Sequence, residues 1–272
     1  MHTLFFTKMQ SLGNDFILLD ALTQEINLDP SLIEKLSDRK VGIGFDQLLI
    51  VEPPTNPEKD FYFRIFNADG SEAEQCGNGT RCAASFLLEK ELTKKETLNW
   101  QSLGGNFTTF YQSQQEIQTH LQLATCTPEA HTLELKTLDK CLEVHNISIG
   151  NPHTVTFVDN IQAAEVDKIG RAISSLSAFP NGVNVGFCQV VDSGFIRLRV
   201  FERGVGETRA CGTGACAAAI VSSSKNLIGE KVKISMPGGK LKLTLPPGRE
   251  SVLLSGPATK IFDGEVRLPS LT

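Results

Sequence analysis

An internal repeat constrains the fold of this chain more than any other feature. With a shift of 135 positions, residues 64–84 match residues 199–219 without a gap, with eight identities in 21 positions. The identities include a Cys-Gly-x-Gly motif that begins at Cys76 in one copy and at Cys211 in the other. A looser echo relates residues 13–15 to residues 150–152. A period of about half the chain indicates duplication. We therefore predict two similar halves, each with a strand, a loop, the motif and a helix.

Short strands outnumber helices in the secondary structure that the sequence predicts. Strand-like runs lie at residues 61–66, 106–111, 145–149, 154–158, 195–201, 231–236 and 240–245. Helix-like runs lie at residues 31–36, 82–89, 165–174 and 215–224. This pattern favours a mixed α/β or α+β protein. An internal boundary is expected in the polar, turn-rich stretches at residues 112–118 and 125–128.

The composition is that of a soluble globular protein with one large domain or two ordinary ones. Hydrophobic residues make up 40% of the 272 positions, and the formal net charge is −5. No apolar run approaches the ~20 residues of a membrane helix, and no signal peptide is recognised at the N-terminus. No block of like charge suggests a nucleic acid or a membrane as partner. Seven cysteines without a secretory signal favour a reducing cytoplasm over a disulfide framework.

Each Cys-Gly-x-Gly motif precedes an Ala-rich helix, and this position suits acid–base chemistry. Unpaired N–H groups and the positive end of the dipole at a helix N-terminus stabilise a thiolate. The glycines permit close approach of a ligand, and the N–H groups beyond the cysteine form an anion site suited to a carboxylate. Two such half-sites would place one sulfur on each side of a substrate α-carbon. One thiolate and one thiol could then invert the configuration by two-base proton transfer without a cofactor.

The sequence resembles the diaminopimelate epimerase family along essentially its whole length. Residues 66–82 (FNADGSEAEQCGNGTRC) and 202–217 (ERGVGETRACGTGACA) resemble the two active-site motifs of that family. Further matches, in family order, are KM at 8–9, LGNDF at 12–16, GIG at 42–44 followed by DQ at 46–47, GNPH at 150–153, GVNV at 182–185 and GPA at 256–258.

The resemblance implies two pseudo-symmetric halves, each a curled, mixed or antiparallel sheet around a central helix. We expect residues 1–120, completed by residues 262–272, to form the half that carries Cys76, and residues 121–261 to form the half that carries Cys211. The implied activity interconverts LL- and meso-2,6-diaminopimelate for lysine and peptidoglycan precursor synthesis, with no cofactor and no metal. The implied partner is this small molecule, and a homodimer remains open.

The resemblance also implies roles for individual residues. Cys76 and Cys211 would be the acid and the base, and His153 and Glu202 would tune them. The carboxylate at the reacting centre would be held by Gly77, Asn78, Gly212 and Thr213. The distal amino-acid end would be bound by Asn14, Gln47, Asn67, Asn151, Asn184, Glu202 and Arg203. Amide and Arg donors suit a carboxylate, and a carboxylate suits an ammonium group.

The chain departs from the common family pattern at a few positions. Gln10-Ser11 replaces a common His-Gly, Phe45 replaces a common Ala, and Gln75 replaces a common Met. None of these changes removes a catalytic group. We expect the bulkier Phe45, near Gln47, to alter which substrate end fits, so turnover of glutamate or aspartate is a hypothesis.

Simpler interpretations apply to several residues. Packing is expected for the remaining cysteines, Cys82, Cys126, Cys141, Cys188 and Cys216. The spacing of Cys76 and Cys82 is unlike that of zinc sites. Arg81 and Arg209 are interpreted as solvated or ion-paired loop residues. Glu72 and Glu207 are either helix-start carboxylates or members of loop ion pairs.

Competing functions remain at this point. A proline or hydroxyproline racemase of the same fold would tend to carry His after Cys-Gly, where this chain has Asn78. A thiol redox sensor would use Cys76 and Cys211 as a reversible disulfide. A Cys–His hydrolase of Cys76 and His153 would leave the second motif unexplained.

Overall fold

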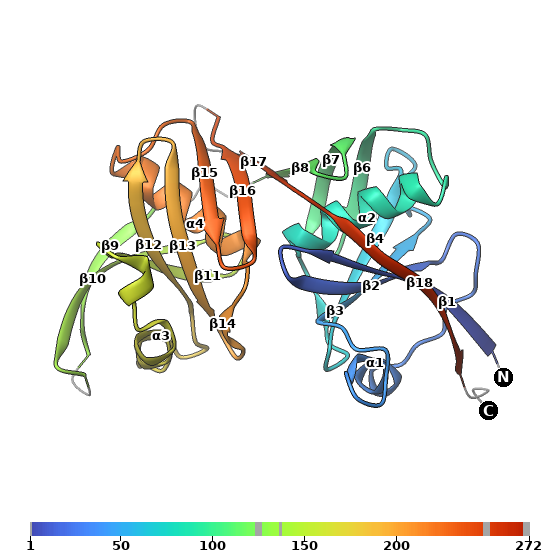
Figure 1. Ribbon diagram of the computed structural model, residues 1–272, viewed down its shortest axis with the longest axis horizontal. Helices are drawn as coiled ribbons and strands as arrows, with labels where there is room; N and C mark the ends of the chain where they lie inside the picture. Colours follow the sequence, from blue (N-terminus) through green and yellow to red (C-terminus); the bar gives the residue numbers. More distant parts are fainter. Residues whose placement is uncertain (1, 123–126, 136–137, 247–250, 269–272) are drawn as a thin grey trace. The chain divides into compact units, whose positions relative to one another are not determined.

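The computed structural model describes residues 2–122, 127–135, 138–246 and 251–268. The chain forms two compact units, Met1–His120 with Gly256–Thr272 and Leu121–Ser255. Each unit combines a sheet with two α-helices (Figure 1). The chain passes between the units within β8 (Glu116–Gln122) and again within β17 (Ser251–Gly256).

The other elements of the first unit are β1 (His2–Ser11), β2 (Asn14–Asp20), α1 (Pro30–Ser37), β3 (Gln47–Glu52), β4 (Phe61–Asn67), β5 (Glu72–Ala73), α2 (Gly77–Glu89), β6 (Thr97–Ser102), β7 (Gly105–Ser113) and β18 (Thr259–Leu268). Those of the second unit are β9 (Glu129–Leu135), β10 (Lys140–Ser148), β11 (Pro152–Phe157), the 3₁₀ turn η2 (Ile161–Ala163), α3 (Val166–Ser174), β12 (Asn184–Asp192), β13 (Phe195–Glu202), β14 (Gly206–Thr208), α4 (Gly212–Ser224), β15 (Lys231–Met236) and β16 (Gly239–Thr244).

The two units repeat one strand-pairing pattern. In the first, β1–β2 is antiparallel, β2–β3 parallel, β3–β4 antiparallel, β4–β6 parallel and β6–β7 antiparallel. In the second, β10–β11, β11–β12, β12–β13, β13–β15 and β15–β16 follow the same alternation. A further antiparallel strand pairs with the first strand of each series, β18 with β1 and β9 with β10. The repeat seen in the sequence therefore extends through the whole topology of both units.

The helix that follows the cysteine motif is the core of each unit. In α2 every residue from Asn78 to Leu87 is buried, and in α4 every residue from Gly214 to Ser222 is buried. Small Ala, Gly and Ser side chains let the surrounding strands approach α4, and a helix that is apolar on all sides must be enclosed. In the first unit, Trp100, Phe61, Phe63 and Phe107 pack as an aromatic group beside α2.

The predicted fold class is confirmed, and the predicted strands and helices correspond to observed elements. Residues 112–118, where an internal boundary was expected, comprise the end of β7, a turn and the start of β8, and the two units divide directly after them, between His120 and Leu121. Of the second predicted boundary stretch, residues 125 and 126 lie outside the described residues. Of the two interpretations given to the repeat-equivalent Glu72 and Glu207, the structure shows the ion pair. Glu72 pairs with Arg64 and Glu207 pairs with Arg199, each through both carboxylate oxygens.

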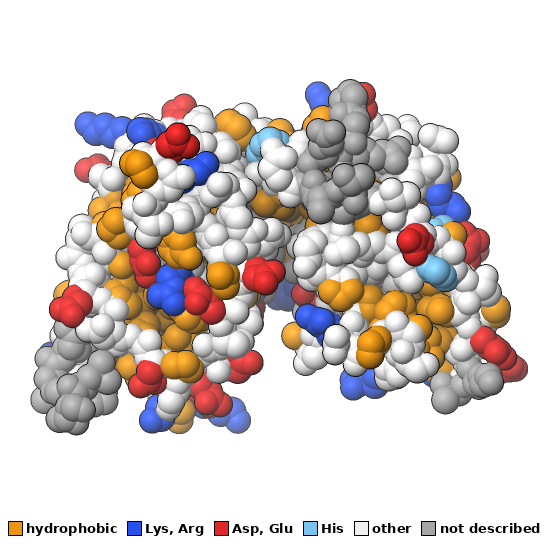
Figure 2. Space-filling view, turned by 180° about the vertical axis from the view of Figure 1, so that it is seen from behind, with side chains coloured by type: hydrophobic (Ala, Val, Ile, Leu, Met, Phe, Trp, Pro, Cys, Tyr) orange, Lys and Arg blue, Asp and Glu red, His pale blue; other side chains and the backbone are white. Residues whose placement is uncertain are grey.

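Charged side chains of both signs are interspersed on the face of the molecule drawn in Figure 2. Charged side chains of both units form ion pairs, such as Lys95 with Asp60 and Lys140 with Glu165. Among the helices of the described ranges, none is long and apolar enough to cross a membrane.

Candidate active site

Cys76 and Cys211 occupy the same position in the two units, immediately before a central helix. Each is the N-cap residue, with an extended backbone, and each helix has 13 residues. The Cys76 sulfur accepts a hydrogen bond from the Gly79 N–H at 3.3 Å, and the Cys211 sulfur accepts one from the Gly214 N–H at 3.4 Å. Each sulfur therefore accepts a hydrogen bond from a backbone N–H group of the first helical turn. At this end of the helix the dipole favours a negative charge on the sulfur.

Glycine in the first turn of both helices leaves room for the cysteine sulfur that lies against it. A Cβ added at Gly79 would lie 3.3 Å from the Cys76 sulfur, and one added at Gly214 would lie 3.3 Å from the Cys211 sulfur. At Gly214 the Cβ would also lie 3.0 Å from a methyl group of Val200. The motif thus brings the sulfur onto the backbone N–H with no side chain between them.

The two cysteines differ in their surroundings. Cys76 is half-buried, whereas only 6% of Cys211 is exposed. Burial raises the pKa of the Cys211 thiol well above its usual value, and the nearby Glu202 carboxylate raises it further. Hydrogen bonds from Thr213 and Gly214 act in the opposite direction. Cys211 is therefore strongly biased toward the protonated thiol.

In the first unit, three predicted ligands lie at neighbouring strand ends. Gln47 begins β3 and pairs across the sheet with Asn67, the last residue of β4. The Gln47 amide donates to Asn67 Oδ1 at 3.0 Å. Asn14 begins β2, and its Oδ1 lies 3.9 Å from the Cys76 sulfur. Sheet pairing therefore gathers these amides near the start of α2.

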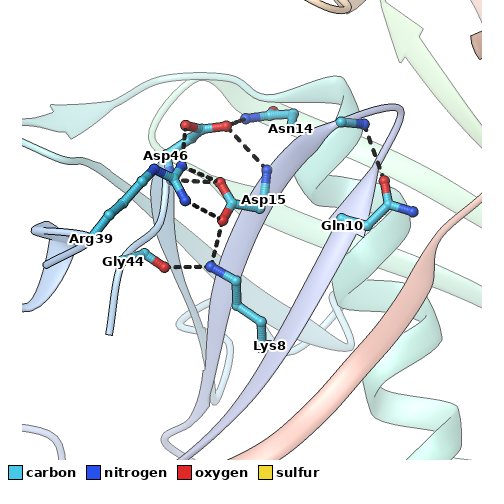
Figure 3. A network of polar contacts seen from close by, with 8 residues as sticks. Lys8, Gln10, Asn14, Asp15, Arg39, Gly44 and Asp46 are labelled. Carbon is cyan, nitrogen blue, oxygen red and sulfur yellow. Dashed lines mark hydrogen bonds and ion pairs between the residues drawn. The ribbon is translucent and has the colours of Figure 1, made fainter. Parts of the chain in front are cut away.

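A charged network orients Asn14 (Figure 3). The Asn14 amide donates to Asp46 Oδ2 at 3.0 Å, and Arg39 holds the other oxygen of Asp46 at 2.8 Å. Arg39 also binds both oxygens of Asp15, which Lys8 contacts in turn. Burial raises the pKa of Asp15, but the hydrogen bonds from Arg39 and Lys8 outweigh this and hold it far below its usual value. The sequence did not indicate this network, although three of its members fall in the matched motifs.

In the second unit, His153 lies between two predicted ligands. Its Nε2 lies 3.0 Å from Asn151 Oδ1 and 3.5 Å from the Asn184 amide nitrogen. Only 2% of His153 is exposed, and burial lowers its pKa to about 4. The imidazole is therefore neutral at pH 7 and organises amides rather than supplying a positive charge.

Glu202 and Arg203 lie where β13 ends. The backbone N–H of Arg203 donates to Asn184 Oδ1 at 2.9 Å, which joins this end to the start of β12. The Thr208 hydroxyl donates to Glu202 Oε1. The Arg203 side chain is exposed and donates to the Asn181 carbonyl at 3.2 Å. An anchored carboxylate and an accessible guanidinium thus lie side by side in the sequence.

Arg81 is not the solvated loop residue expected from the sequence. It lies in α2, is fully buried, and donates to the Gly77 carbonyl at 2.9 Å and to Asn78 Oδ1 at 2.6 Å. It also donates to the Ser11 hydroxyl at 2.7 Å, and that hydroxyl donates to the Pro257 carbonyl at 2.8 Å. Helical spacing of three and four residues allows these contacts, because long helical side chains point back toward the N-terminus. Arg209, in contrast, is exposed.

The expectation that Phe45 shapes substrate fit is wrong. Phe45 is buried in a hydrophobic cluster with Leu4, Ile17 and Leu48, so its ring fills the core and not a ligand site. Gln75 is exposed and donates to the Gly104 carbonyl at 3.3 Å. Gln10 accepts the Gly13 N–H at 3.1 Å and so braces the turn that presents Asn14.

The packing prediction for the remaining cysteines is correct in part. Cys82, Cys188 and Cys216 are buried, and burial raises the pKa of Cys188 to about 12. Cys141 is exposed instead, because it lies on β10 where the pattern alternates. Cys126 lies outside the described residues. Within the described ranges, no group of three or more His, Cys, Asp and Glu side chains could hold a metal ion.

Comparison with solved structures shows which fold this is. A hydroxyproline epimerase from Agrobacterium vitis matches with a TM-score of 0.76 and 13% identity, over 97% of this chain and 92% of that one. A PhzF-family phenazine biosynthesis protein from Bacillus anthracis matches with a TM-score of 0.74 and 17% identity, over 98% and 100% of the two chains. The class of protein is therefore the two-unit fold that these proteins share.

Sequence comparison identifies the family within that fold. The diaminopimelate epimerase family profile matches residues 6–122 and 145–261. A diaminopimelate epimerase from Ectopseudomonas mendocina (strain ymp) is 43% identical, over 97% of this chain and 99% of that protein. The chain belongs to the diaminopimelate epimerase family.

Proposed function

We propose that this enzyme interconverts LL- and meso-2,6-diaminopimelate and uses Cys76 and Cys211 as its acid and base. The duplicated cysteine N-cap is the observation that carries the proposal. Each unit supplies one sulfur at a helix N-terminus, and inversion at carbon needs one proton acceptor and one proton donor. Membership of the family supports the substrate. The product would supply the synthesis of lysine and of peptidoglycan precursors.

The proposed step transfers protons only. One thiolate accepts the α-proton as the Cα–H bond breaks, and the electron pair delocalises into the adjacent carboxylate. The other thiol donates its proton to the opposite face, and the Cα–H bond reforms there with inverted configuration. The thiol and thiolate have then exchanged roles, so the pair holds one proton before and after the reaction and titrates as a unit. No oxidant or reductant takes part.

The backbone N–H groups that follow each cysteine would stabilise the charge that develops on the carboxylate. We assign this role to Gly77, Asn78, Gly212 and Thr213, which form the first turns of α2 and α4. The Asn78 side chain is buried, and its oxygen is committed to Arg81. This hydrogen bond fixes the orientation of the Asn78 amide, so that its nitrogen faces away from Arg81 as a donor.

The distal end of the substrate would be bound by amides and charged groups. We assign Asn14, Gln47, Asn67, Asn151, Asn184, Glu202 and Arg203 to this role, with Glu202 facing the ammonium group and Arg203 the carboxylate. His153 would keep Asn151 in position as a neutral hydrogen-bonding group, with Nε2–H as donor to Asn151 Oδ1. Working thiols require a reducing compartment, so we place the enzyme in the cytoplasm.

The decisive experiment follows deuterium at Cα in heavy water for a panel of substrates. We expect fast incorporation with diaminopimelate, and none above background with proline, glutamate or aspartate. Incorporation with proline alone would replace the proposal by a proline racemase. No incorporation with any substrate, together with reversible linking of Cys76 to Cys211 by a mild oxidant, would favour a redox sensor.

Replacement of Arg203 tests recognition of the distal carboxylate. In Arg203→Met we expect kcat/KM for diaminopimelate to fall roughly 10- to 100-fold, mainly through KM, because a hydrogen bond to a charged group is lost. Arg203→Lys should recover part of the loss, since an ammonium group keeps the positive charge but not the two parallel N–H donors of a guanidinium. Steady-state kinetics measure both. Arg197→Met, an exposed residue of β13, is the control, and an unchanged KM in Arg203→Met would contradict the assignment.

A further inference from the structure

We infer that Arg81 is a positioning residue of the first half-site: it fixes Gly77 and Asn78, and it places at the first turn of α2, which Cys76 caps, a positive charge that the second unit lacks at the equivalent position. This inference rests on the proposed function, because it concerns the same two cysteines. Its structural basis is the buried guanidinium, whose donors reach the Gly77 carbonyl, Asn78 Oδ1 and the Ser11 hydroxyl.

The position of Arg81 is costly without an anion nearby. The guanidinium reaches back to the first turn of α2, where the positive end of the helix dipole disfavours a cation. Full burial adds a desolvation cost. A thiolate at Cys76 or a substrate carboxylate at the Gly77 and Asn78 N–H groups would offset both costs. An anion at this helix start would therefore be stabilised by the buried guanidinium.

The second half-site has the opposite charge pattern. In the repeat, Arg81 corresponds to Cys216, a buried and uncharged side chain, and Asn67 corresponds to Glu202. The second unit thus has a carboxylate near its cysteine and no cation at the position of Arg81. Two half-sites with the same backbone differ in electrostatics: the first favours the thiolate and the second favours the thiol.

The other charged groups packed around α2 do not cancel this effect. Lys8, Asp15, Arg39 and Asp46 form one network of two cations and two anions near Asn14, which leaves no net charge. The remaining titratable side chains that the structure describes on α2, β1, β2, β3 and β7 are Cys82, Glu89, Asp20, Glu52 and Tyr111. Asp20 accepts hydrogen bonds from Leu22 and Thr23. Glu52 pairs with Arg64, and Glu89 accepts hydrogen bonds from Ser85 and Gln114 at the far end of the helix.

Ser11 completes the support of Arg81. Its hydroxyl accepts from Arg81 and donates to the Pro257 carbonyl, so β1, α2 and the segment before β18 meet at one buried oxygen. A glycine or alanine at this position would remove that oxygen. The serine of this chain therefore holds the guanidinium in one orientation, and Asn78 with it.

The test compares Arg81→Met, Arg81→Lys and Ser11→Ala with the wild type in the full-length enzyme. Iodoacetamide labelling across a pH series, followed by mass spectrometry of the separate peptides, reports Cys76 and Cys211 independently. In Arg81→Met we expect the pH for half-maximal labelling of Cys76 to rise by about one unit, as loss of a neighbouring charge does. The labelling of Cys211 should stay where it is. We also expect kcat/KM to fall roughly 10- to 100-fold.

The conservative variants separate charge from geometry. Arg81→Lys should keep the labelling pH of Cys76 but lose activity, because an ammonium group cannot serve Gly77, Asn78 and Ser11 together. Ser11→Ala should lose roughly 3- to 10-fold in kcat/KM with unchanged labelling, because only one of the hydrogen bonds that hold the guanidinium is removed. Arg64→Met is the control, since it removes an arginine of the same unit that pairs with Glu72.

Equal shifts of Cys76 and Cys211 in Arg81→Met, or no shift of Cys76, would overturn the inference. Should Arg81→Met not fold, Arg81→Lys decides: wild-type kcat/KM in that variant would also overturn it. The labelling experiment needs no substrate, so it tests the inference separately from the proposed function. A wild-type enzyme that fails to turn over diaminopimelate would contradict the proposed function, whereas the labelling of Cys76 would still test the effect of Arg81.

Discussion

Cys76→Ala and Cys211→Ala are each expected to lower kcat for epimerisation of diaminopimelate by at least roughly 10³-fold, within the range that a positioned acid or base contributes. Both losses should be of this size because inversion needs a proton acceptor on one face and a donor on the other. Removing either sulfur leaves the first-turn N–H groups of α2 and α4 in place, so substrate binding should weaken far less than turnover. Deuterium incorporation with inversion at Cα, measured in heavy water, checks the prediction.

Exposed Cys141 provides the matched control for these variants. Cys141→Ala removes a thiol of the second unit that lies on β10, away from both helix starts, and should leave turnover unchanged. Circular dichroism establishes that each variant is folded. The two-base mechanism would be wrong if either Cys76→Ala or Cys211→Ala retained inversion within 10-fold of the wild type, since a single remaining sulfur cannot serve both faces.

The repeat allowed much of this fold to be predicted from sequence. Cysteine and glycine identities located the start of both central helices, and the structure places Cys76 and Cys211 as N-caps of α2 and α4. The strands β4, β13, β15 and β16 were predicted close to their observed bounds. The strand β3 was not, because the buried run QLLIVE has no polar alternation, and periodicity alone does not separate such a run from a helix.

The errors share a physical cause: single residues were placed by their usual preferences. Arginine is almost always exposed, so Arg81 was assigned to solvent, and only the tertiary contacts to Ser11 and Pro257 reveal its burial. Phe45 precedes the predicted ligand Gln47 by two positions, but it lies before β3 begins, so strand alternation does not set its direction, and its ring enters the core. The charged network around Asp15 joins segments more than 20 residues apart, which no local pattern indicates.

Glu202→Gln is expected to shift the pH dependence of the enzyme as well as its activity. The carboxylate of Glu202 raises the pKa of the Cys211 thiol in addition to the effect of burial. The active cysteine pair holds one proton, and activity is lost at high pH when that last proton leaves. Removing the negative charge lowers the proton affinity of Cys211, so the basic limb of the kcat/KM profile should move to lower pH. We expect a shift of about one unit, equivalent to the loss of one neighbouring charge.

The same substitution should lower kcat/KM at neutral pH by roughly 10- to 100-fold, because the proposed bond from the distal ammonium group loses its charge. Glu207→Gln is the matched control: it lies on β14, four residues before Cys211, and its carboxylate is held by Arg199 through both oxygens. That variant should lose some stability and keep the wild-type pH profile, because the Glu207 carboxylate is paired with Arg199 and is not among the main groups that raise the pKa of Cys211. A basic limb that stays in place in Glu202→Gln, or one that moves equally in Glu207→Gln, would show that Glu202 does not tune Cys211. The pH profile separates this tuning from substrate binding, since a lost ammonium contact alone would raise KM at every pH without moving the limb.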